Sequence, residues 1–221
     1  MTFITIKKTH REELVLAGKD ITEKSLEAYN DVFSDIINVL LFGGKRYISE
    51  DELEQGRERG DYDGELGVRE HERDRSKFWR HSNIRIAYLG LENETEAEDD
   101  IAFRVIGYDG AAYRDQISYY KDKDGKRRKK TERYPVVTLV LYFGYEHAWD
   151  MAESLHEALG DRIPAQLKPF VQDYKLNIFN IAFLPDEVVA KFTSDFSQIL
   201  STHAKRKWQQ YRHSNVDKLV R

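Results

Sequence analysis

The sequence predicts an α/β protein with a mixed central sheet that is flanked by helices. Two observations predict this fold class. Residues 22–42 carry apolar side chains at helical spacing, and residues 135–144 form a near-continuous apolar stretch, which is the strongest strand signal in the chain. A strand that is apolar on both sides is typical of a sheet centre that is covered on both faces. We therefore expect helices on both faces of this sheet.

The helix at residues 22–42 is the first predicted element. Gly43-Gly44 follows it, and glycine commonly ends a helix. On the face opposite the apolar stripe, Asp31, Asp35 and Asn38 stack about one turn apart. This pattern is typical of a helix face that is exposed to solvent.

The remaining elements follow from local patterning. Residues 49–67 are rich in charge and glycine without an apolar period, so we expect an irregular excursion there. Strands are predicted at residues 74–80, 84–92, 135–144 and 174–183. Helices are predicted at residues 100–120, 148–159, 185–192 and 195–212, and a charged loop at residues 121–133.

The length of 221 residues suits one large domain with a core of its own. We expect an N-terminal arm at residues 1–21, the main domain at residues 22–184, and a C-terminal helical extension at residues 185–221 that packs on this domain. A homodimer is one of the assemblies that these patterns leave open.

The composition excludes several classes of site. The chain has no cysteine, which excludes disulfides, thiolate zinc sites, iron–sulfur clusters and cysteine nucleophiles. Any metal must therefore bind to oxygen or imidazole. No phosphate-binding GxxxxGK[ST] loop occurs, so no nucleotide cofactor is expected. No stretch approaches the roughly 20 apolar residues of a membrane span, so we expect no membrane partner and, by default, a cytoplasmic location.

Charges are segregated along the chain, although the net charge is only −4. An acidic block occupies residues 92–100. A basic block consists of Lys126, Arg127, Arg128, Lys129 and Lys130. The basic block is either a solvated hairpin tip or a contact for nucleic-acid phosphates, which would give salt-sensitive binding.

Three carboxylates are the candidate chemical site. Side chains alternate along a strand, so Glu92 and Glu94 should share a face. If the strand that begins at Asp74 pairs with theirs, all three carboxylates converge. Hard oxygen ligands favour Mg²⁺, Mn²⁺ or Ca²⁺, and such an ion can activate water for phosphodiester hydrolysis. The alternative is that residues 94–100 are only an acidic helix start, which the helix dipole favours.

Several segments in order resemble the recombination-promoting nuclease and putative transposase family of the PD-(D/E)XK nuclease superfamily. The similar segments are residues 30–38 (NDVFSDIIN), Arg73-Asp74, 90–94 (GLENE), 104–109, 113–116, 134–142, 170–175 and 192–196. The resemblance implies a restriction-endonuclease-like core within residues 22–184.

The resemblance also implies an activity: a DNA endonuclease that depends on Mg²⁺ or Mn²⁺ and promotes recombination or element mobility. By the same resemblance, Asp74 and Glu92 are metal ligands, and Glu94 completes the strand motif. Asp35 assists them, and Gln116 contacts metal-bound water or the phosphate.

Position 94 departs from the family pattern. The family has Gln there and the wider superfamily has Lys, whereas this chain has Glu94. A third carboxylate cannot supply the positive charge of a lysine, and Lys77 is a candidate replacement for it. Glu94 either recruits a second ion or marks a catalytically weak or inactive nuclease fold that still binds nucleic acid. A purely structural or protein-interaction domain is the third alternative.

Overall fold

The computed structural model describes residues 23–56, 74–82, 84–117 and 119–201. Its centre is a five-stranded sheet in the order β1-β2-β3-β6-β7. The strands are β1 (Leu53–Gln55), β2 (Arg75–His81), β3 (Ile84–Glu94), β6 (Val136–Tyr142) and β7 (Asn177–Asn180). β1, β2 and β3 pair antiparallel, whereas β3, β6 and β7 pair parallel. The predicted mixed sheet is confirmed, and it is compatible with a restriction-endonuclease-like fold.

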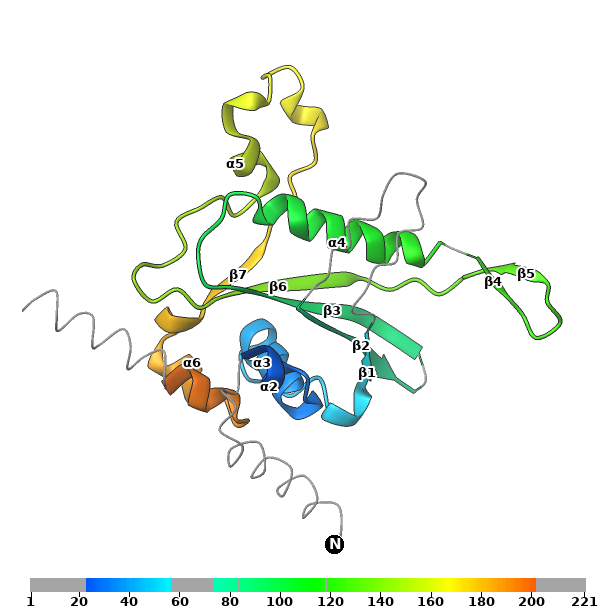
Figure 1. The fold of residues 1–221 in the computed structure, drawn as a ribbon, viewed down its shortest axis with the longest axis horizontal. Helices are drawn as coiled ribbons and strands as arrows, with labels where there is room; N and C mark the ends of the chain where they lie inside the picture. The colour runs from blue at the N-terminus through cyan, green and yellow to red at the C-terminus, as the bar shows by residue number, and fades with distance from the viewer. Residues whose placement is uncertain (1–22, 57–73, 83, 118, 202–221) are drawn as a thin grey trace, which may run out of the picture.

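Helices cover both faces of this sheet (Figure 1). One face carries α4 (Ile101–Asp115). The opposite face carries α2 (Glu23–Glu27), α3 (Asn30–Phe42) and α6 (Asp186–Val189). The shorter helices are α5 (Leu155–Leu159) and the 3₁₀ turns η1 (Glu50–Glu52), η2 (Gly160–Arg162), η3 (Lys168–Phe170) and η4 (Ile181–Phe183). None of the helices in the described ranges has the length and apolar character needed to cross a membrane.

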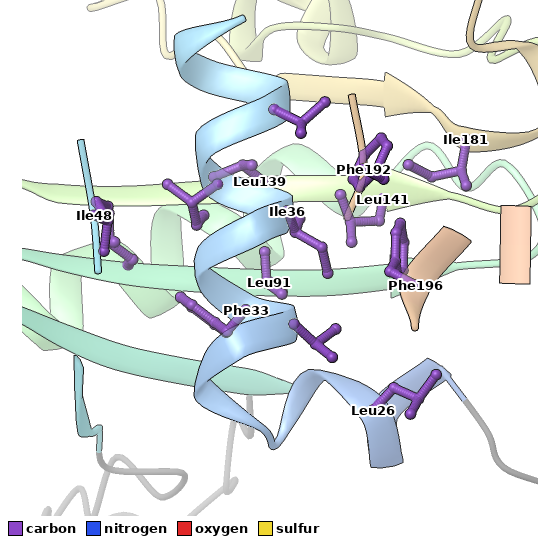
Figure 2. Close-up of a cluster of buried hydrophobic side chains, with 14 of the residues drawn as sticks. Leu26, Phe33, Ile36, Ile48, Leu91, Leu139, Leu141, Ile181, Phe192 and Phe196 are labelled. Atoms are coloured by element: carbon purple, nitrogen blue, oxygen red, sulfur yellow. The ribbon is translucent and has the colours of Figure 1, made fainter. Parts of the chain in front are cut away.

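The main core lies between α3 and the sheet. Phe33 and Ile36 of α3 pack with Leu91 of β3 and Leu139 of β6, and all four are fully buried (Figure 2). The apolar stripe of the predicted helix is therefore the face that the sheet buries. From the C-terminal part of the chain, Phe192, Phe196 and Leu200 join the same cluster.

The α4 face has a smaller core. Ile101 and Val105 of α4 pack with Val140 and Tyr142 of β6 and with Trp149. β6 therefore buries successive residues on opposite faces, which confirms that the apolar stretch forms a central strand.

The predicted helix at residues 22–42 is interrupted. α2 ends at Glu27, and Tyr29 adopts an extended backbone conformation before α3 begins. The Lys77 ammonium donates to the Ala28 carbonyl at 2.6 Å, so a tertiary contact engages that carbonyl at the break. Asn38 of α3 is also buried rather than exposed. The stripe pattern alone could not reveal these long-range polar contacts.

The helix predicted at residues 100–120 ends earlier. α4 stops at Asp115, and β4 (Tyr119–Lys121) pairs with β5 (Arg127–Lys129) in a separate two-stranded hairpin. We call this hairpin the basic ribbon. The sequence predicted helix for one of its strands and loop for the other, because each is too short to show an apolar alternation.

Other boundaries also shift. The expected irregular excursion at residues 49–67 begins with η1 and β1, and its residues 57–67 lie outside the described residues. The predicted strand at 174–183 is shorter, as β7 and η4. The N-terminal arm predicted at residues 1–21, Arg73, and residues 202–221 of the predicted extension also lie outside them.

Asn38 joins α3 to the chain that follows it. Its Nδ2 donates to the Ile48 carbonyl at 2.7 Å, and its Oδ1 accepts from the backbone N–H groups of Tyr47 and Ile48 at 3.0 Å each. These bonds hold the connection between α3 and β1 against the main core.

We predict that Asn38→Ala lowers the free energy of unfolding by about 3 kcal/mol, because it leaves buried backbone groups without partners. Urea unfolding measures the change. Asn177→Ala is the matched control, because Asn177 is exposed. Within the described residues its side chain donates one bond, to the Thr138 carbonyl, so its removal should cost about 1 kcal/mol or less. Equal losses in the two variants would contradict this role for Asn38.

Candidate functional site

The sheet register brings Asp74 next to Glu92. Arg75 pairs with Leu91, so Asp74, which directly precedes β2, lies opposite Glu92 of β3. One Asp74 oxygen accepts the backbone N–H of Asn93 at 2.9 Å. Side chains alternate along β3, so Glu92 and Glu94 both lie on the face that α4 covers. The face sharing expected from the sequence is thus present in the structure.

Glu92 is buried at 5% exposure, and its electrostatic environment is unusual. Burial raises the pKa of this carboxyl to about 7, with the nearby Asp74 charge adding to the effect and Arg104 opposing it. The Tyr108 hydroxyl donates to Oε1 at 3.3 Å. The other oxygen, Oε2, is buried without a hydrogen-bond partner within the described residues. Such a group is a candidate for binding a ligand.

Arg104 of α4 is the cation at this site. Its guanidinium forms an ion pair with Glu94 and lies 3.9 Å from Oε1 of Glu92. Glu98 and Asp100 surround the same guanidinium at 3.9 and 3.7 Å. Burial raises the pKa of the Glu94 carboxyl, and Arg104 opposes that rise. Glu94 is therefore already paired, unlike Oε2 of Glu92.

The sequence prediction missed Arg104 and Tyr108. A signal for them exists: they are four residues apart on α4 and lie beside Ile101 and Val105, two residues of its buried stripe. Polar side chains that flank a buried stripe lie close to the sheet. What the sequence could not provide was the knowledge that this stripe faces the carboxylates of β3.

Lys77 lies on the opposite face of the sheet. It pairs with Leu89 and is only 1% exposed. Its ammonium donates to the Ala28 carbonyl and to Oδ1 of Asn30, and it lies 5.5 Å from the centre of the Phe33 ring. The prediction that Lys77 replaces the missing lysine is wrong, because strand alternation directs it towards α3 instead of α4.

Two other predicted site residues lie apart from the carboxylates. The Gln116 side chain at the end of α4 is buried and exchanges two hydrogen bonds with the backbone of Tyr134. Asp35 of α3 accepts from the backbone N–H groups of Thr193 and Ser194, so it holds the C-terminal segment. The structure brings neither residue to the carboxylates.

Within the described ranges, no group of three or more acidic or histidine side chains is placed to hold a metal ion. Asp74, Glu92 and Glu94 therefore do not form the three-carboxylate metal site expected from the sequence, and Glu94 is instead paired with Arg104. The remaining pair, Asp74 and Glu92, suits Mg²⁺, which proteins usually bind through one or two carboxylates while water and substrate complete the shell. The unpartnered Oε2 of Glu92 fits the same type of ion.

The predicted basic block lies in the basic ribbon, which projects beyond the end of α4 (Figure 1). Both ribbon strands are exposed along their whole length. Asp122 at the turn accepts the backbone N–H groups of Asp124 and Lys126. The block is thus part of an ordered hairpin and not a loop without structure.

The raised pKa of Glu92 predicts a pH-dependent stability. Folded Glu92 keeps its proton up to about pH 7, whereas the unfolded group releases it near pH 4.5. The free energy of unfolding should therefore fall as pH rises between these values, by up to about 3 kcal/mol. Urea unfolding from pH 4 to pH 8 measures this contribution as the difference between the parent and Glu92→Gln.

The matched control for that measurement is Glu96→Gln, because Glu96 is exposed on the same acidic block. This variant should keep the pH dependence of the parent. A difference between parent and Glu92→Gln that stays constant with pH would show that Glu92 titrates normally.

Comparison with known proteins identifies the family. The model of the family described as "Putative transposase, YhgA-like" matches residues 80–220, which is more than half of the chain. The match includes Glu92, Glu94, Arg104 and the basic ribbon, and it begins after Asp74. This family is a PD-(D/E)XK-like group. No curated protein and no solved structure was found to match the chain. The chain belongs to the YhgA-like putative transposase family.

Proposed function

We propose that this protein is a divalent-metal-dependent DNA endonuclease that acts in recombination or in the movement of DNA elements. One observation carries the proposal: the buried carboxylate of Glu92 lies beside Asp74 and has an oxygen without a hydrogen-bond partner in the described part of the chain. Membership of a transposase family supports DNA as the substrate.

The cost of burying Glu92 beside a second carboxylate favours a cation at this place. Burial and the charge of Asp74 both disfavour ionised Glu92, so a bound divalent cation would offset an existing penalty. Asp74 and Glu92 would hold the ion, for which Mg²⁺ and Mn²⁺ are the best candidates. Such an ion activates water and stabilises the charge that develops on a phosphate during hydrolysis.

Residues of the chain orient this pair. The backbone N–H of Asn93 holds one oxygen of Asp74, and the Tyr108 hydroxyl holds Oε1 of Glu92. Burial and the nearby Glu92 raise the pKa of Tyr108, so this hydroxyl stays protonated and remains a donor. With Oε1 held in this way, Oε2 of Glu92 is the oxygen that points to a metal.

Arg104 is the proposed contact for the scissile phosphate. It supplies the positive charge that Glu94 cannot supply, and its side chain is partly exposed, at 28%. Guanidinium groups bind phosphate oxygens through several donors at once. Glu94 anchors one side of the guanidinium and so orients it.

We predict that Asp74→Ala and Glu92→Gln each lower metal-dependent DNA cleavage by at least about 100-fold, since each removes a proposed ligand of the metal. Conversion of supercoiled plasmid to nicked or linear forms with Mg²⁺ or Mn²⁺ measures the rate. Calorimetric titration with Mn²⁺ should show a matching loss of affinity in both variants.

Asp99→Asn is the control, because Asp99 is an exposed carboxylate of the same acidic block. It should cut and bind Mn²⁺ like the parent. Cleavage by Asp74→Ala and Glu92→Gln at the parental rate would assign the activity to another site.

A second function is favoured by the ion pair between Glu94 and Arg104. If Glu94 withholds the guanidinium from phosphate, the protein binds nucleic acid with the nuclease fold but cuts weakly or not at all. Glu94 then acts as an internal competitor for the phosphate, because both are anions that the same cation attracts.

We predict for this second function that Glu94→Gln raises plasmid cleavage by about tenfold or more, since about 1.4 kcal/mol of released interaction gives that factor. Glu98→Gln is the matched control, because Glu98 is half exposed and 3.9 Å from the same guanidinium. A parent that cuts well and gains nothing from Glu94→Gln would rule out the second function.

A further inference from the structure

The basic ribbon has two chemically different faces. In β4 and β5, Tyr119 pairs with Lys129, Tyr120 with Arg128, and Lys121 with Arg127. Residues that pair directly share a face, and successive residues alternate between faces. One face, here called the Arg127 face, therefore carries Tyr119, Lys121, Arg127 and Lys129. The other, here called the Arg128 face, carries Tyr120 and Arg128.

Arg128 of this face and Lys130, which follows β5, are each already paired with a carboxylate. Nε of Arg128 lies 2.8 Å from a carboxylate oxygen of Asp122. Next along the chain, Nζ of Lys130 donates to both oxygens of Asp115, at 3.0 and 2.9 Å. These carboxylates satisfy the charge that a phosphate would otherwise attract.

The Arg127 face differs in this respect. Lys121, Arg127 and Lys129 are exposed, and within the part of the chain that the structure describes none of them forms an ion pair with a carboxylate. Three cations without a carboxylate partner in the described residues therefore lie together on one side of an ordered hairpin. The sequence alone does not show that these three cations differ from Arg128 and Lys130 in lacking a carboxylate partner.

Arg127 is also oriented on this face. Its guanidinium carbon lies 4.1 Å from the centre of the Tyr119 ring. Stacking of this kind holds the guanidinium plane against the ring and leaves its edge donors available to an anion. The turn is held as well, because Asp122 binds two backbone N–H groups and Gly125 adopts a φ of 74°. Little freedom of the Arg127 side chain or of the turn backbone would be lost on binding.

We propose, on the basis of the endonuclease function proposed above, that the Arg127 face binds the phosphate backbone of duplex DNA and that the Arg128 face points away from it. A row of cations on an ordered hairpin, unpaired within the described residues, matches a regular row of phosphates. Proteins that bind single strands depend on aromatic rings that stack on bases, whereas the Tyr119 ring is engaged by Arg127. Duplex DNA is therefore the favoured partner for this face.

The position of the ribbon fits a substrate that also reaches the carboxylates. Arg104 lies in the first turn of α4, and Gln116 follows the helix. Twelve helical residues span roughly 18 Å, which corresponds to about five base pairs at 3.4 Å each. One duplex could contact the ribbon at one end of α4 and the carboxylate site at the other.

The test compares two double variants of equal charge and composition. One combines Arg127→Gln with Lys129→Gln, and the other combines Arg128→Gln with Lys130→Gln. Each pair removes one arginine and one lysine from the same five residues, so the long-range field changes equally. Fluorescence anisotropy measures affinity for a fluorescent duplex and for the matching single strand, between about 50 and 200 mM salt. The protein is used without divalent ions, so that no metal-dependent cleavage occurs during the measurement.

We expect the Arg127→Gln, Lys129→Gln variant to lose about 1.8 from the slope of log affinity against log salt, because two phosphate contacts disappear. Its affinity for the duplex should fall at least about tenfold below that of the Arg128→Gln, Lys130→Gln variant. The latter should keep a slope close to that of the parent. Circular dichroism melting of both variants verifies that the fold is retained.

Equal losses in the two variants would overturn the assignment of the face, as would a larger loss in the Arg128→Gln, Lys130→Gln variant. A loss that affects single strands more than the duplex would overturn the choice of duplex DNA. A parent protein without salt-dependent duplex binding would overturn the ribbon as a DNA contact. Cleavage that depends on Asp74 and Glu92 but not on either ribbon pair would keep the endonuclease function and remove only the role of the ribbon.

Discussion

Successive residues at the end of β3 are buried on opposite faces of the sheet, and the arrangement of the site depends on that constraint. Leu91 is fully buried in the core beneath α3, while Glu92, the next residue, is buried beneath α4. A slip of one residue in register would exchange these environments, placing a carboxylate in the main core and an apolar side chain in the site. Packing of the main core against α3 thus fixes the position of the carboxylates on the far side.

Polar contacts on the α2 and α3 side of the sheet reinforce this register. The side-chain amide of Asn93 donates to the buried Glu27 of α2, and its backbone N–H donates to Asp74. Asn93 therefore connects a helix on one face with a site residue that lies across the pair of strands. Lys77 joins β2 to the same helical region through Ala28 and Asn30. The place where Asp74, before β2, lies opposite Glu92, near the end of β3, is held by contacts between residues that are 19 to 66 positions apart in the sequence.

The site combines burial of like charges with the guanidinium of Arg104. Folding usually avoids burial of carboxylates, since their desolvation is costly, and clusters of this kind are more frequent at functional sites than in structural cores. Here burial raises the pKa of Glu92 to about 7, and it also raises the pKa of Glu94, although the ion pair with Arg104 opposes the latter rise. The two carboxylates therefore differ: one has an oxygen without a hydrogen-bond partner among the described residues, and the other is engaged with a guanidinium. α4 provides that guanidinium at its start and leads into the basic ribbon after its end.

The sequence by itself determined the features that depend on local periodicity. The apolar stripe of α3, the continuous apolar stretch of β6, and the shared face of Glu92 and Glu94 were all predictable. Each of them follows from side-chain spacing along one segment. The family was also recognisable from the order of its motifs, because that order survives even where a single position such as Glu94 departs from the pattern.

Only the tertiary structure decided which charges meet. Arg104 and Lys77 both appear in the sequence as cations near the motif, but strand alternation directs Lys77 towards α3, and the docking of α4 brings Arg104 to Glu94. Arg128 and Arg127 are adjacent, yet one is neutralised by Asp122 and the other stacks on Tyr119. The physical reason is the same in both cases: the energy of a charge depends on its distance to other charges and on its burial, and neither quantity is a property of sequence spacing.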